Sequence, residues 1–435
     1  MQHATTLLLG LKGLVVQRVE LADDGARVVH AITNREWAGV CPACGRRSTS
    51  VKDQAMTSPK DLPYGPAAVK VLWHKRRWRC RTGGCPQRTF TDRVPAVAPG
   101  ARTSVRLRDA VAEAVGENRC VAEVARSHRL SWPTVQRAVS AAVAALPAEP
   151  APTPLLGIDE TRFGRPRWLL SPDGRWVLVE PWETGFVDLT GAQGLLGQVD
   201  GRTGAAVCGW LAQRSQAWRD AVRIVAIDPS APYAAAVRQM LPHTAIAVDH
   251  FHLVLAANRA VTKVRQRVTR EYLGRRGRRT DPAWVNRRHL LRGRERLSDK
   301  RFTQMWNACV DGDPSGELLA TWIAKEELRS LLACAADGGH PHQIRRRLGD
   351  FYSWCARVDV PEVTVLAELI DTWWPAVLTF LRTAVTNAAT EGTNRLIKQV
   401  KRNACGFRNR RNYRDRVRFH CTRSRERART RRLPA

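Results

Sequence analysis

The chain has 435 residues, with 71 Lys and Arg against 40 Asp and Glu, and therefore a formal net charge of +31. Such a balance steers a protein toward polyanions, of which nucleic acid is the obvious one. The length suffices for two to four domains, and a hydrophobic content of 44% supports real cores. No run approaches the apolar length of a membrane span, and the N-terminus lacks a secretion signal. We therefore expect a soluble, intracellular, nucleic-acid-associated protein with no membrane partner.

Four of the eleven cysteines form two short-range pairs, Cys41 with Cys44 and Cys80 with Cys85. Two tight knuckles of this kind bring four thiolates to one tetrahedral ion, which predicts a zinc ribbon with one structural Zn²⁺. Four thiolates leave no open position for chemistry. The alternative, four unrelated cysteines, leaves the paired spacing unexplained. The other seven cysteines are scattered singly and are typical of small buried residues in a reducing compartment.

A basic and aromatic segment, Lys70–Arg79, lies between the two cysteine pairs and is predicted to be a strand. Its Arg76 and Arg77 are candidate DNA contacts. The segment after Pro99 turns helical, and residues 121–139 have the texture of a helix-turn-helix. The residues expected to face a DNA groove from its second helix are Thr134, Gln136 and Arg137.

Four prolines within residues 146–154 indicate a linker, after which the pattern changes to strands. We expect three strands in meander, then a helix, a strand, a helix and a fifth strand. The expected strands are 155–160, 176–179, 185–189, 222–228 and 244–249. This order predicts an α/β sheet of RNase H-like type.

Asp159 and Asp228 end two strands that such a sheet places side by side. Two adjacent carboxylates repel unless a cation lies between them, so the pair implies a metal or a raised pKa. A strand-end Asp is also a common helix cap, which is the alternative for either residue taken alone.

The segment 387–398 near the C-terminus reads as a helix that begins with an acid and continues with basic and amide side chains. A carboxylate suits a metal, whereas amide and ammonium groups suit phosphate oxygens. Solvated charged helix faces are common, so this pattern gains weight only beside the two aspartates. Glu391 is the candidate metal ligand, and the candidate DNA contacts are Asn394, Lys398, Lys401 and Arg402.

Residues 253–380 are helical and rich in Arg and Trp, which predicts a helical insertion between the fifth strand and the Glu391 helix. The tryptophans are expected in its core. Seven arginines between Arg265 and Arg279 form a basic stretch that could hold DNA, and residues 408–435 form an Arg-rich tail.

The motifs together resemble bacterial insertion-sequence transposases of the ISL-three type, which have an RNase H-like DDE catalytic core. The resemblance covers nearly the whole chain, and its most specific parts are Asp249-His250-Phe251-His252 and the Thr390–Lys398 helix. It implies that Asp159, Asp228 and Glu391 are the metal-binding triad. Asp249 and His252 also look like the C/D-x-x-H motif that lies beside the active site in Mutator-like and hAT-like DDE transposases.

The resemblance implies a cytoplasmic, bacterial nucleoid-associated DNA transposase that acts on double-stranded DNA. It would bind the terminal inverted repeats of its element, cleave at the ends and join the 3′-OH ends to target DNA. Two Mg²⁺ ions, for which Mn²⁺ can substitute, would serve this phosphoryl transfer. Because two ends must be brought together before cutting, we expect a homodimer or larger assembly on DNA.

The expected architecture is a multidomain α/β chain in which a zinc ribbon and a helix-turn-helix precede an RNase H-like mixed-sheet core with a large helical insertion. The expected parts are the zinc ribbon (1–98), the helix-turn-helix (99–146), a linker (147–154), the first part of the core (155–252), the insertion (253–380), the final core helix (381–407) and the tail (408–435).

Three alternatives stay open from the sequence. Asp249 rather than Asp228 could be the second catalytic aspartate, although strand order favours Asp228. The chain could be a non-catalytic regulator derived from a transposase, which binds DNA through its zinc ribbon and helix-turn-helix. A structure-specific nuclease of the same fold would leave those two modules without a role.

Overall fold

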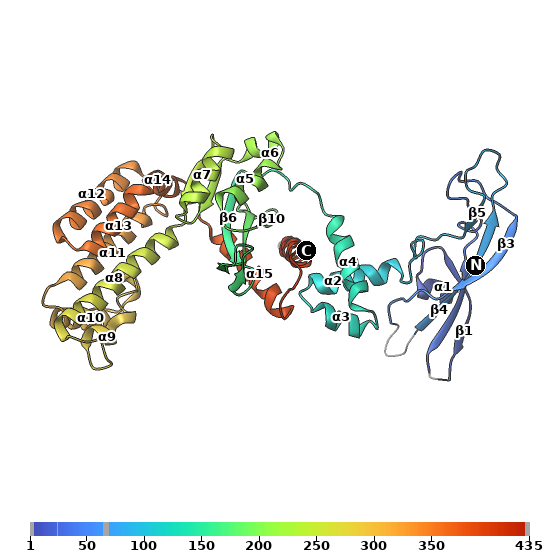
Figure 1. Ribbon diagram of the computed structural model, residues 1–435, viewed down its shortest axis with the longest axis horizontal. Coiled ribbons are helices and arrows are strands. Elements are labelled where there is room, and N and C mark those ends of the chain that lie inside the picture. The colour runs from blue at the N-terminus through green and yellow to red at the C-terminus, as the bar shows by residue number, and fades with distance from the viewer. Residues whose placement is uncertain (1–3, 24, 64–68, 431–435) are drawn as a thin grey trace. The chain divides into compact units, whose positions relative to one another are not determined.

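The computed structural model describes residues 4–23, 25–63 and 69–430 (Figure 1). The chain forms two compact units, one of residues 1–148 and 397–435 and the other of residues 149–396. The first boundary falls inside the proline-rich segment that we expected to be a linker. Helix α15 (Ala388–Asn403) contains the second boundary.

The N-terminal sheet of the first unit has the order β1-β2-β4-β3, with β5 added to β4. β2 and β4 are parallel, and the other pairs are antiparallel. Its buried face includes Val29, Val71 and Trp73. The predicted basic strand is β4. The elements are α1 (Ala4–Leu9), β1 (Leu14–Leu21), β2 (Arg27–Thr33), β3 (Val51–Thr57), β4 (Val69–Arg79) and β5 (Thr89–Thr91).

The helix-turn-helix consists of α2 (Val105–Gly116), α3 (Val121–Ser127) and α4 (Trp132–Ala144). A fourth helix, α16 (Arg410–Thr430), packs against α2 and α4. Phe419 of α16 belongs to the same buried cluster as Leu107 and Val135. The segment expected to be a separate tail therefore begins as part of this domain. The last residues of that tail, 431–435, lie outside the described residues.

The central sheet of the second unit has the order β10-β9-β6-β11-β12. β6 pairs antiparallel with β9 and parallel with β11, which in turn is parallel to β12. This is the RNase H-like order that the sequence predicts. A buried cluster that includes Phe186, Trp210 and Trp218 joins the sheet to its helices. The elements are β6 (Leu155–Arg162), β9 (Trp182–Asp188), β10 (Leu195–Asp200), α5 (Gly204–Ala212), α6 (Gln216–Ala221), β11 (Ile224–Ile227), α7 (Ala231–Met240) and β12 (Ala245–Val248).

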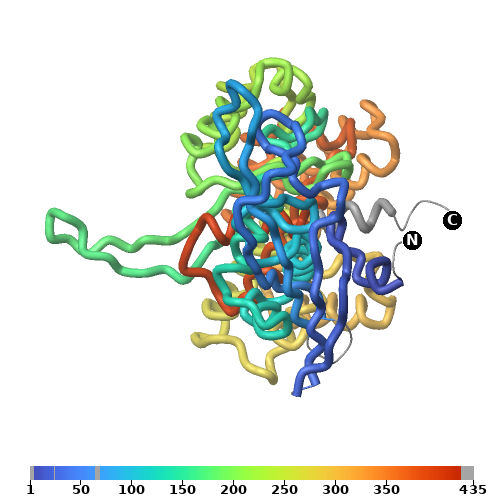
Figure 2. Tube along the Cα trace, turned by 90° about the vertical axis from the view of Figure 1, so that its right-hand side faces the viewer, coloured from blue at the N-terminus to red at the C-terminus, as the bar shows by residue number. Residues whose placement is uncertain are grey.

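One strand assignment from the sequence is wrong. The segment 176–179 was expected to be the second strand of this sheet, but it pairs with 167–170 in a separate two-stranded hairpin, β7 (Arg167–Leu170) and β8 (Trp176–Val179). The second and third strands are instead β9 and β10. Figure 2 shows this hairpin, in green, extending away from the rest of its unit.

The helical insertion runs from α8 to α14 and has its own large buried cluster. Trp322 is buried there, and Trp306, Trp354, Trp373 and Trp374 pack against it half-buried, which confirms the core role expected of these tryptophans. The helices are α8 (His250–Leu273), α9 (Pro282–Val285), α10 (Asp299–Gly312), α11 (Glu317–Ala333), α12 (Pro341–Val358), α13 (Pro361–Thr372) and α14 (Trp374–Thr383).

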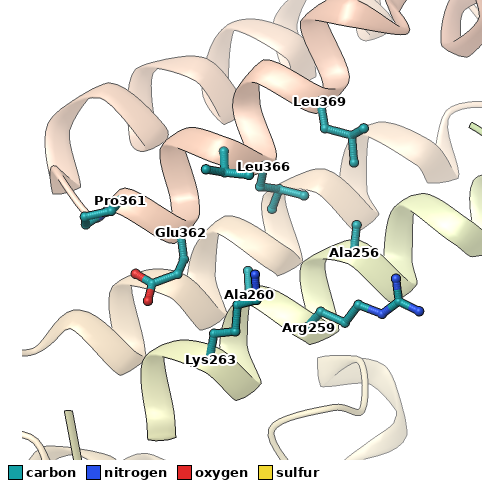
Figure 3. A pocket seen from close by; sticks show the side chains of 9 residues that line it. Ala256, Arg259, Ala260, Lys263, Pro361, Glu362, Leu366 and Leu369 are labelled. Atoms are coloured by element: carbon teal, nitrogen blue, oxygen red, sulfur yellow. The ribbon is translucent and has the colours of Figure 1, made fainter. Parts of the chain in front are cut away.

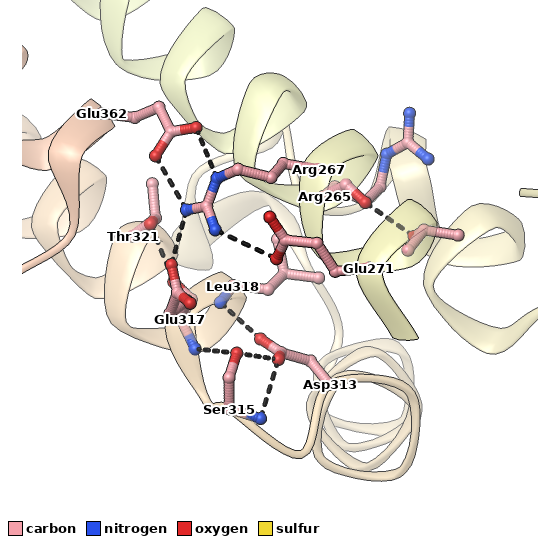
Figure 4. A network of polar contacts seen from close by, with 10 residues as sticks. Arg265, Arg267, Glu271, Asp313, Ser315, Glu317, Leu318, Thr321 and Glu362 are labelled. Atoms are coloured by element: carbon pink, nitrogen blue, oxygen red, sulfur yellow. Dashed lines mark hydrogen bonds and ion pairs between the residues drawn. The ribbon is translucent and has the colours of Figure 1, made fainter. Parts of the chain in front are cut away.

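Arg267 of α8 ties the insertion together (Figure 4). Its guanidinium donates to Glu362 of α13 at 2.9 and 3.0 Å and to Glu317 of α11 at 2.5 Å. Arg275 pairs with Asp281 at 2.7 Å, and Arg265 is buried. Of the arginines that could hold DNA, Arg267 and Arg275 are thus engaged with carboxylates, and Arg265 is buried.

A groove of about 450 Å³ separates α8 from α13 (Figure 3). Small and apolar side chains such as Ala260 and Leu366 line it, and Arg259 and Lys263 lie on the α8 side. Glu362 also lines the groove, but Arg267 already holds its carboxylate. The groove thus has a basic edge on α8.

Within the described part of the chain, no single helix is long and apolar enough to cross a membrane. α13 and α14, which meet at a bend of 70°, pass that test only as a pair and only by length and composition.

Candidate active site and DNA contacts

Two carboxylates meet where β6 and β11 run side by side. Ala226 of β11 lies opposite Gly157 of β6, and two residues further along each chain come Asp228 and Asp159. Burial, followed by the charge of Asp228, raises the pKa of Asp159 to about 7. Burial likewise raises the pKa of Asp228 to about 6, against the opposing effect of His252. A partly buried carboxylate pair of this kind favours a cation between its members.

Helix α15 reaches this pair through Asn394, which is only 6% exposed. The side-chain amide Nδ2 of Asn394 donates to Oδ2 of Asp159 at 2.6 Å. The other oxygen, Oδ1, accepts from the backbone N–H of Glu160 at 2.7 Å. Both oxygens of Asp159 are therefore held. Glu391, half-buried, lies one turn before Asn394 and so on the same face of α15.

The close approach of α15 to β6 depends on Gly157. A Cβ at this position would lie 2.1 Å from Thr390 Oγ1 and 2.8 Å from Asn387 Oδ1. Only glycine admits the start of the helix at this distance. Asn387 Nδ2 also donates to the carbonyl oxygen of Ile158 at 3.4 Å. The sequence analysis assigned no role to Gly157 or Asn387, although a glycine within a buried strand is a signal of close backbone approach.

Asp249 and His252 lie beside Asp228, on the side of the site where α8 begins. Asp249 follows β12, is buried, and caps α8 by accepting from the backbone N–H of Phe251 at 3.2 Å. His252 Nε2 lies 3.0 Å from Asp228 Oδ2, and its Nδ1 lies 3.4 Å from Asp249 Oδ2. The contact with Asp249 is the main cause that raises the pKa of His252. The structure thus gives Asp249 a capping role and places Asp228 directly after β11, the strand that pairs with β6.

The donor set fits a hard divalent cation. Ligand atoms of Asp228, Asp249 and His252 all lie within 4.8 Å of one another, a group that includes neither Asp159 nor Glu391. Asp228 Oδ1 is buried, and the described residues offer it no hydrogen-bond partner. Buried oxygen atoms without partners are costly unless a proton donor or a cation satisfies them. Oxygen ligands are those that Mg²⁺ prefers.

The four predicted zinc ligands come together in the first unit. The Sγ atoms of Cys41 and Cys85 lie 3.9 Å apart, and those of Cys44 and Cys80 lie 3.8 Å apart. A tetrahedron with Zn–S bonds of about 2.3 Å has edges of about 3.8 Å, so the spacing fits a structural Zn²⁺. The backbone N–H of Arg46, followed by the Thr82 hydroxyl, lowers the pKa of Cys44 to about 6 and so favours its thiolate.

The three residues expected to read a DNA groove differ in how exposed they are. Arg137 is exposed and Thr134 is half-buried. Gln136, however, is only 9% exposed, and its Nε2 donates to Ser140 Oγ at 3.5 Å. Ser140 in turn donates to Asp415 of α16 at 3.3 Å. The expectation that Gln136 faces a groove is therefore wrong, because α16 packs along that side of α4.

The other predicted DNA contacts also differ in exposure. Arg76 and Arg77 are exposed on β4, and Lys398 and Arg402 are exposed on α15, where Lys401 is half-buried. Asn394 does not belong with them. Its amide contacts Asp159 and its side chain is buried, so the expected phosphate contact gives way to a contact inside the candidate active site.

Three family models match successive parts of the chain between residues 37 and 417. A model described as "Transposase", for the DDE core of the ISL3 family, matches residues 156–417. The "Helix-turn-helix domain of transposase family ISL3" matches residues 93–143, and the "zinc-finger of transposase IS204/IS1001/IS1096/IS1165" matches residues 37–85.

One curated relative is the "Transposase for insertion sequence element IS1001" of Bordetella parapertussis. It is 25% identical over 404 residues, which cover 92% of this chain and 93% of the relative. A solved structure, "Drosophila P element transposase strand transfer complex", is similar with a TM-score of 0.38 and 9% identity over 72% of this chain and 91% of the other.

Proposed function

We propose that this chain, which belongs to the ISL3 family of transposases, cleaves DNA at the ends of its insertion sequence and joins the 3′-OH ends to target DNA. The observation that carries the proposal is the convergence at Asp159. Asp228 approaches it from the adjacent strand, and Asn394, one turn after Glu391, contacts it from α15.

Asp159, Asp228 and Glu391 would hold the divalent ions, Mg²⁺ or in its place Mn²⁺. Bound in a pair, such ions supply an activated water and stabilise the leaving 3′ oxygen of an in-line displacement. The protein holds the ligands in place. Glu160 and Asn394 fix the two oxygens of Asp159, and the His252 ring lies between Asp228 and Asp249, with its nitrogens 3.0 and 3.4 Å from their oxygens.

The first unit would recognise the terminal inverted repeats. Exposed Arg137 is the remaining candidate for base contact on α4, with half-buried Thr134 beside it. Arg76, Arg77, Lys398, Lys401 and Arg402 would contact phosphates, which position a duplex without reading it. Because two ends are cut together, the active species on DNA would be at least a homodimer.

The test compares four variants in an Mg²⁺-dependent cleavage assay on DNA with the element ends. Asp159→Asn, Asp228→Asn and Glu391→Gln should each lower cleavage by about 10³-fold or more while end binding stays near wild type, since each removes a ligand and no basic surface. Asp249→Asn should lower cleavage less than these three changes do, because we assign Asp249 the role of capping α8 and not that of a metal ligand.

Full cleavage by the Asp228 variant, with loss in the Asp249 variant, would show that Asp249 is the catalytic aspartate. End binding without any cleavage by the wild-type protein would support a regulator instead. Cleavage that ignores the end sequence would support a structure-specific nuclease.

A further inference from the structure

The hairpin of β7 and β8 carries an apolar surface that the proposed reaction does not use. Trp168 lies opposite Leu178 and Leu170 lies opposite Trp176. Since alternate residues of a strand share a face, these four side chains lie on one face of the hairpin. They are 62%, 45%, 60% and 65% exposed in that order. We call these four residues the arm face.

The hairpin is anchored firmly at its base. Glu180 accepts from Arg162 at 2.9 Å and from Arg202 at 3.1 Å. Both guanidinium groups lie 4.7 Å from the centre of the Trp182 ring, which they flank by cation–π contacts. The backbone N–H of Phe163 adds a bond to Pro181 at 2.7 Å. These contacts fix the direction in which the hairpin leaves the sheet.

The tip is also ordered. Ser171 N–H donates to Arg175 at 2.8 Å, and Gly174 supplies the positive φ of 78° that the turn needs. Between base and tip, both faces stay uncovered, since Leu169 and Val177 on the opposite face are also exposed. A two-stranded hairpin alone is marginally stable in water. An ordered arm with exposed apolar faces therefore points to a partner.

The size of the arm face suits a protein interface. A tryptophan buries about 150–250 Å² when fully covered, and Trp168 and Trp176 are 62% and 65% exposed, so the two together can supply roughly 200–300 Å². That is about a third of the approximately 800 Å² per partner in a standard interface, before Leu170 and Leu178 are counted. Apolar patches of a few hundred Å² on a protein surface are often functional.

Charge distinguishes a protein partner from DNA. Residues 163–181 hold three arginines, Arg165, Arg167 and Arg175, against Asp173 and Glu180, a net charge of +1. The whole chain has a net charge of +31. An element that grips phosphates needs a strong basic excess, whereas the arm is nearly neutral. Two copies of so basic a chain repel each other, and a nearly neutral apolar arm is where they can meet at least cost.

We infer that the arm face is the contact through which two copies of this chain associate, arm face against arm face about a two-fold axis. In such an isologous contact, residue i of one copy meets residue j of the other, and j meets i. Because the arm face has only four residues, the axis passes close to each of them, and Trp168 lies near Trp168 of the other copy. The inference rests on the dimeric part of the proposed function and deepens it, but its first test needs neither Mg²⁺ nor cleavage.

The first experiment measures the mass of the full-length, zinc-loaded protein by sedimentation over a range of concentrations. The wild type should dimerise, and Trp168→Ser with Trp176→Ser should raise the dimer dissociation constant at least about 100-fold, since buried aromatic anchors dominate interfaces. Val365→Ser, which removes an equally exposed apolar side chain (62%) from the insertion, should leave dimerisation unchanged. Asp159→Asn should also dimerise normally, which separates this result from any failure of catalysis.

A second experiment asks whether the contact is self-complementary. Trp168→Lys and Trp168→Glu should each be monomeric alone, because like charges meet across the axis, and should form a mixed dimer when combined. Circular dichroism of each variant checks that the fold is retained. Mixing that restores no dimer from two folded, monomeric variants would overturn the isologous arrangement.

Two further outcomes would refute the proposal as a whole. One is a wild-type protein that is monomeric in solution and also when bound to two element ends. The other is a double serine variant that dimerises like the wild type but binds a single end more weakly, which would identify the arm as a DNA contact.

Discussion

The amide of Asn394 donates to Asp159 over 2.6 Å and so joins the last helix of the core to its first strand. The two residues are far apart in the sequence, yet this bond orients the carboxylate on which the proposed chemistry depends. Asn394 is therefore expected to act as a positioning residue for Asp159.

Asn394→Ala should raise the Mg²⁺ concentration for half-maximal cleavage by about 10–100-fold, the usual cost of removing a group that orients a metal ligand. DNA binding without metal should not change. Arg395→Ala, exposed on the same helix, is the matched control and should leave the Mg²⁺ dependence intact. An equal loss of cleavage at every Mg²⁺ concentration would contradict the positioning role.

Gly157→Ala should displace the start of α15, because the new Cβ would lie 2.1 Å from Thr390 Oγ1. We expect a loss of about 1–3 kcal/mol of unfolding free energy, typical of an overpacked core, together with loss of cleavage. Adding Thr390→Ala should recover part of the stability. If the two losses were simply additive in urea unfolding, the residues would not be in contact.

The metal-free protein should lose stability as pH rises between about 4 and 7. Burial raises the pKa of Asp159 to about 7 and that of Asp228 to about 6, so the folded chain holds more protons than the unfolded chain in this range. The unfolding free energy then falls by at most about 1.4 kcal/mol per pH unit for each carboxyl.

Thermal unfolding of wild type and Asp159→Asn at pH 5 and pH 8 measures this effect, since the variant cannot ionise at that position. The loss of thermal stability between pH 5 and pH 8 should be smaller in Asp159→Asn than in the wild type. Mg²⁺ should stabilise the wild type more at pH 8 than at pH 5, because ligands must lose their protons to bind metal. Greater protection at pH 5 would count against a metal site at Asp159.

One zinc per chain should be found by elemental analysis, held by Cys41, Cys44, Cys80 and Cys85. Cys80→Ser should lose this zinc and unfold the N-terminal sheet domain. The second unit should stay folded, because it does not contain the zinc ligands. Cys208→Ser, at a single cysteine outside the cluster, is the control. A zinc-free protein whose N-terminal domain gives a native spectrum would refute a structural role.

Arg137→Ala should reduce the free-energy difference between specific and non-specific DNA binding by about 1–3 kcal/mol, as loss of a base contact does. The ratio of the two affinities falls accordingly. Gln136→Ala should leave this ratio unchanged, since Gln136 is covered by the domain core. Arg76→Ala with Arg77→Ala should weaken all DNA equally and reduce the salt slope by about 2. Titrations at several salt concentrations on end and scrambled duplexes measure all three.

The features that could be predicted from the sequence are those that are local or that follow from strand order. Cysteine spacing predicted the cluster of Cys41, Cys44, Cys80 and Cys85, whose sulfur atoms the structure brings together. The order of apolar segments predicted that β6 and β11 are neighbours, and with them Asp159 and Asp228. Such signals survive in sequence because knuckles and buried parallel strands impose residue types at short range.

Which side of each helix or strand is covered could not be predicted from the sequence, because it depends on how distant segments pack. The apolar segment 176–179 has the pattern of a core strand but lies in an exposed hairpin, because periodicity does not say what packs against a strand. Gln136 does not face a groove because α16, which lies 275 residues further along the chain, packs on that side of α4. Asn394 became a partner of Asp159 for the same reason, since its helix is brought to β6 only by the complete fold.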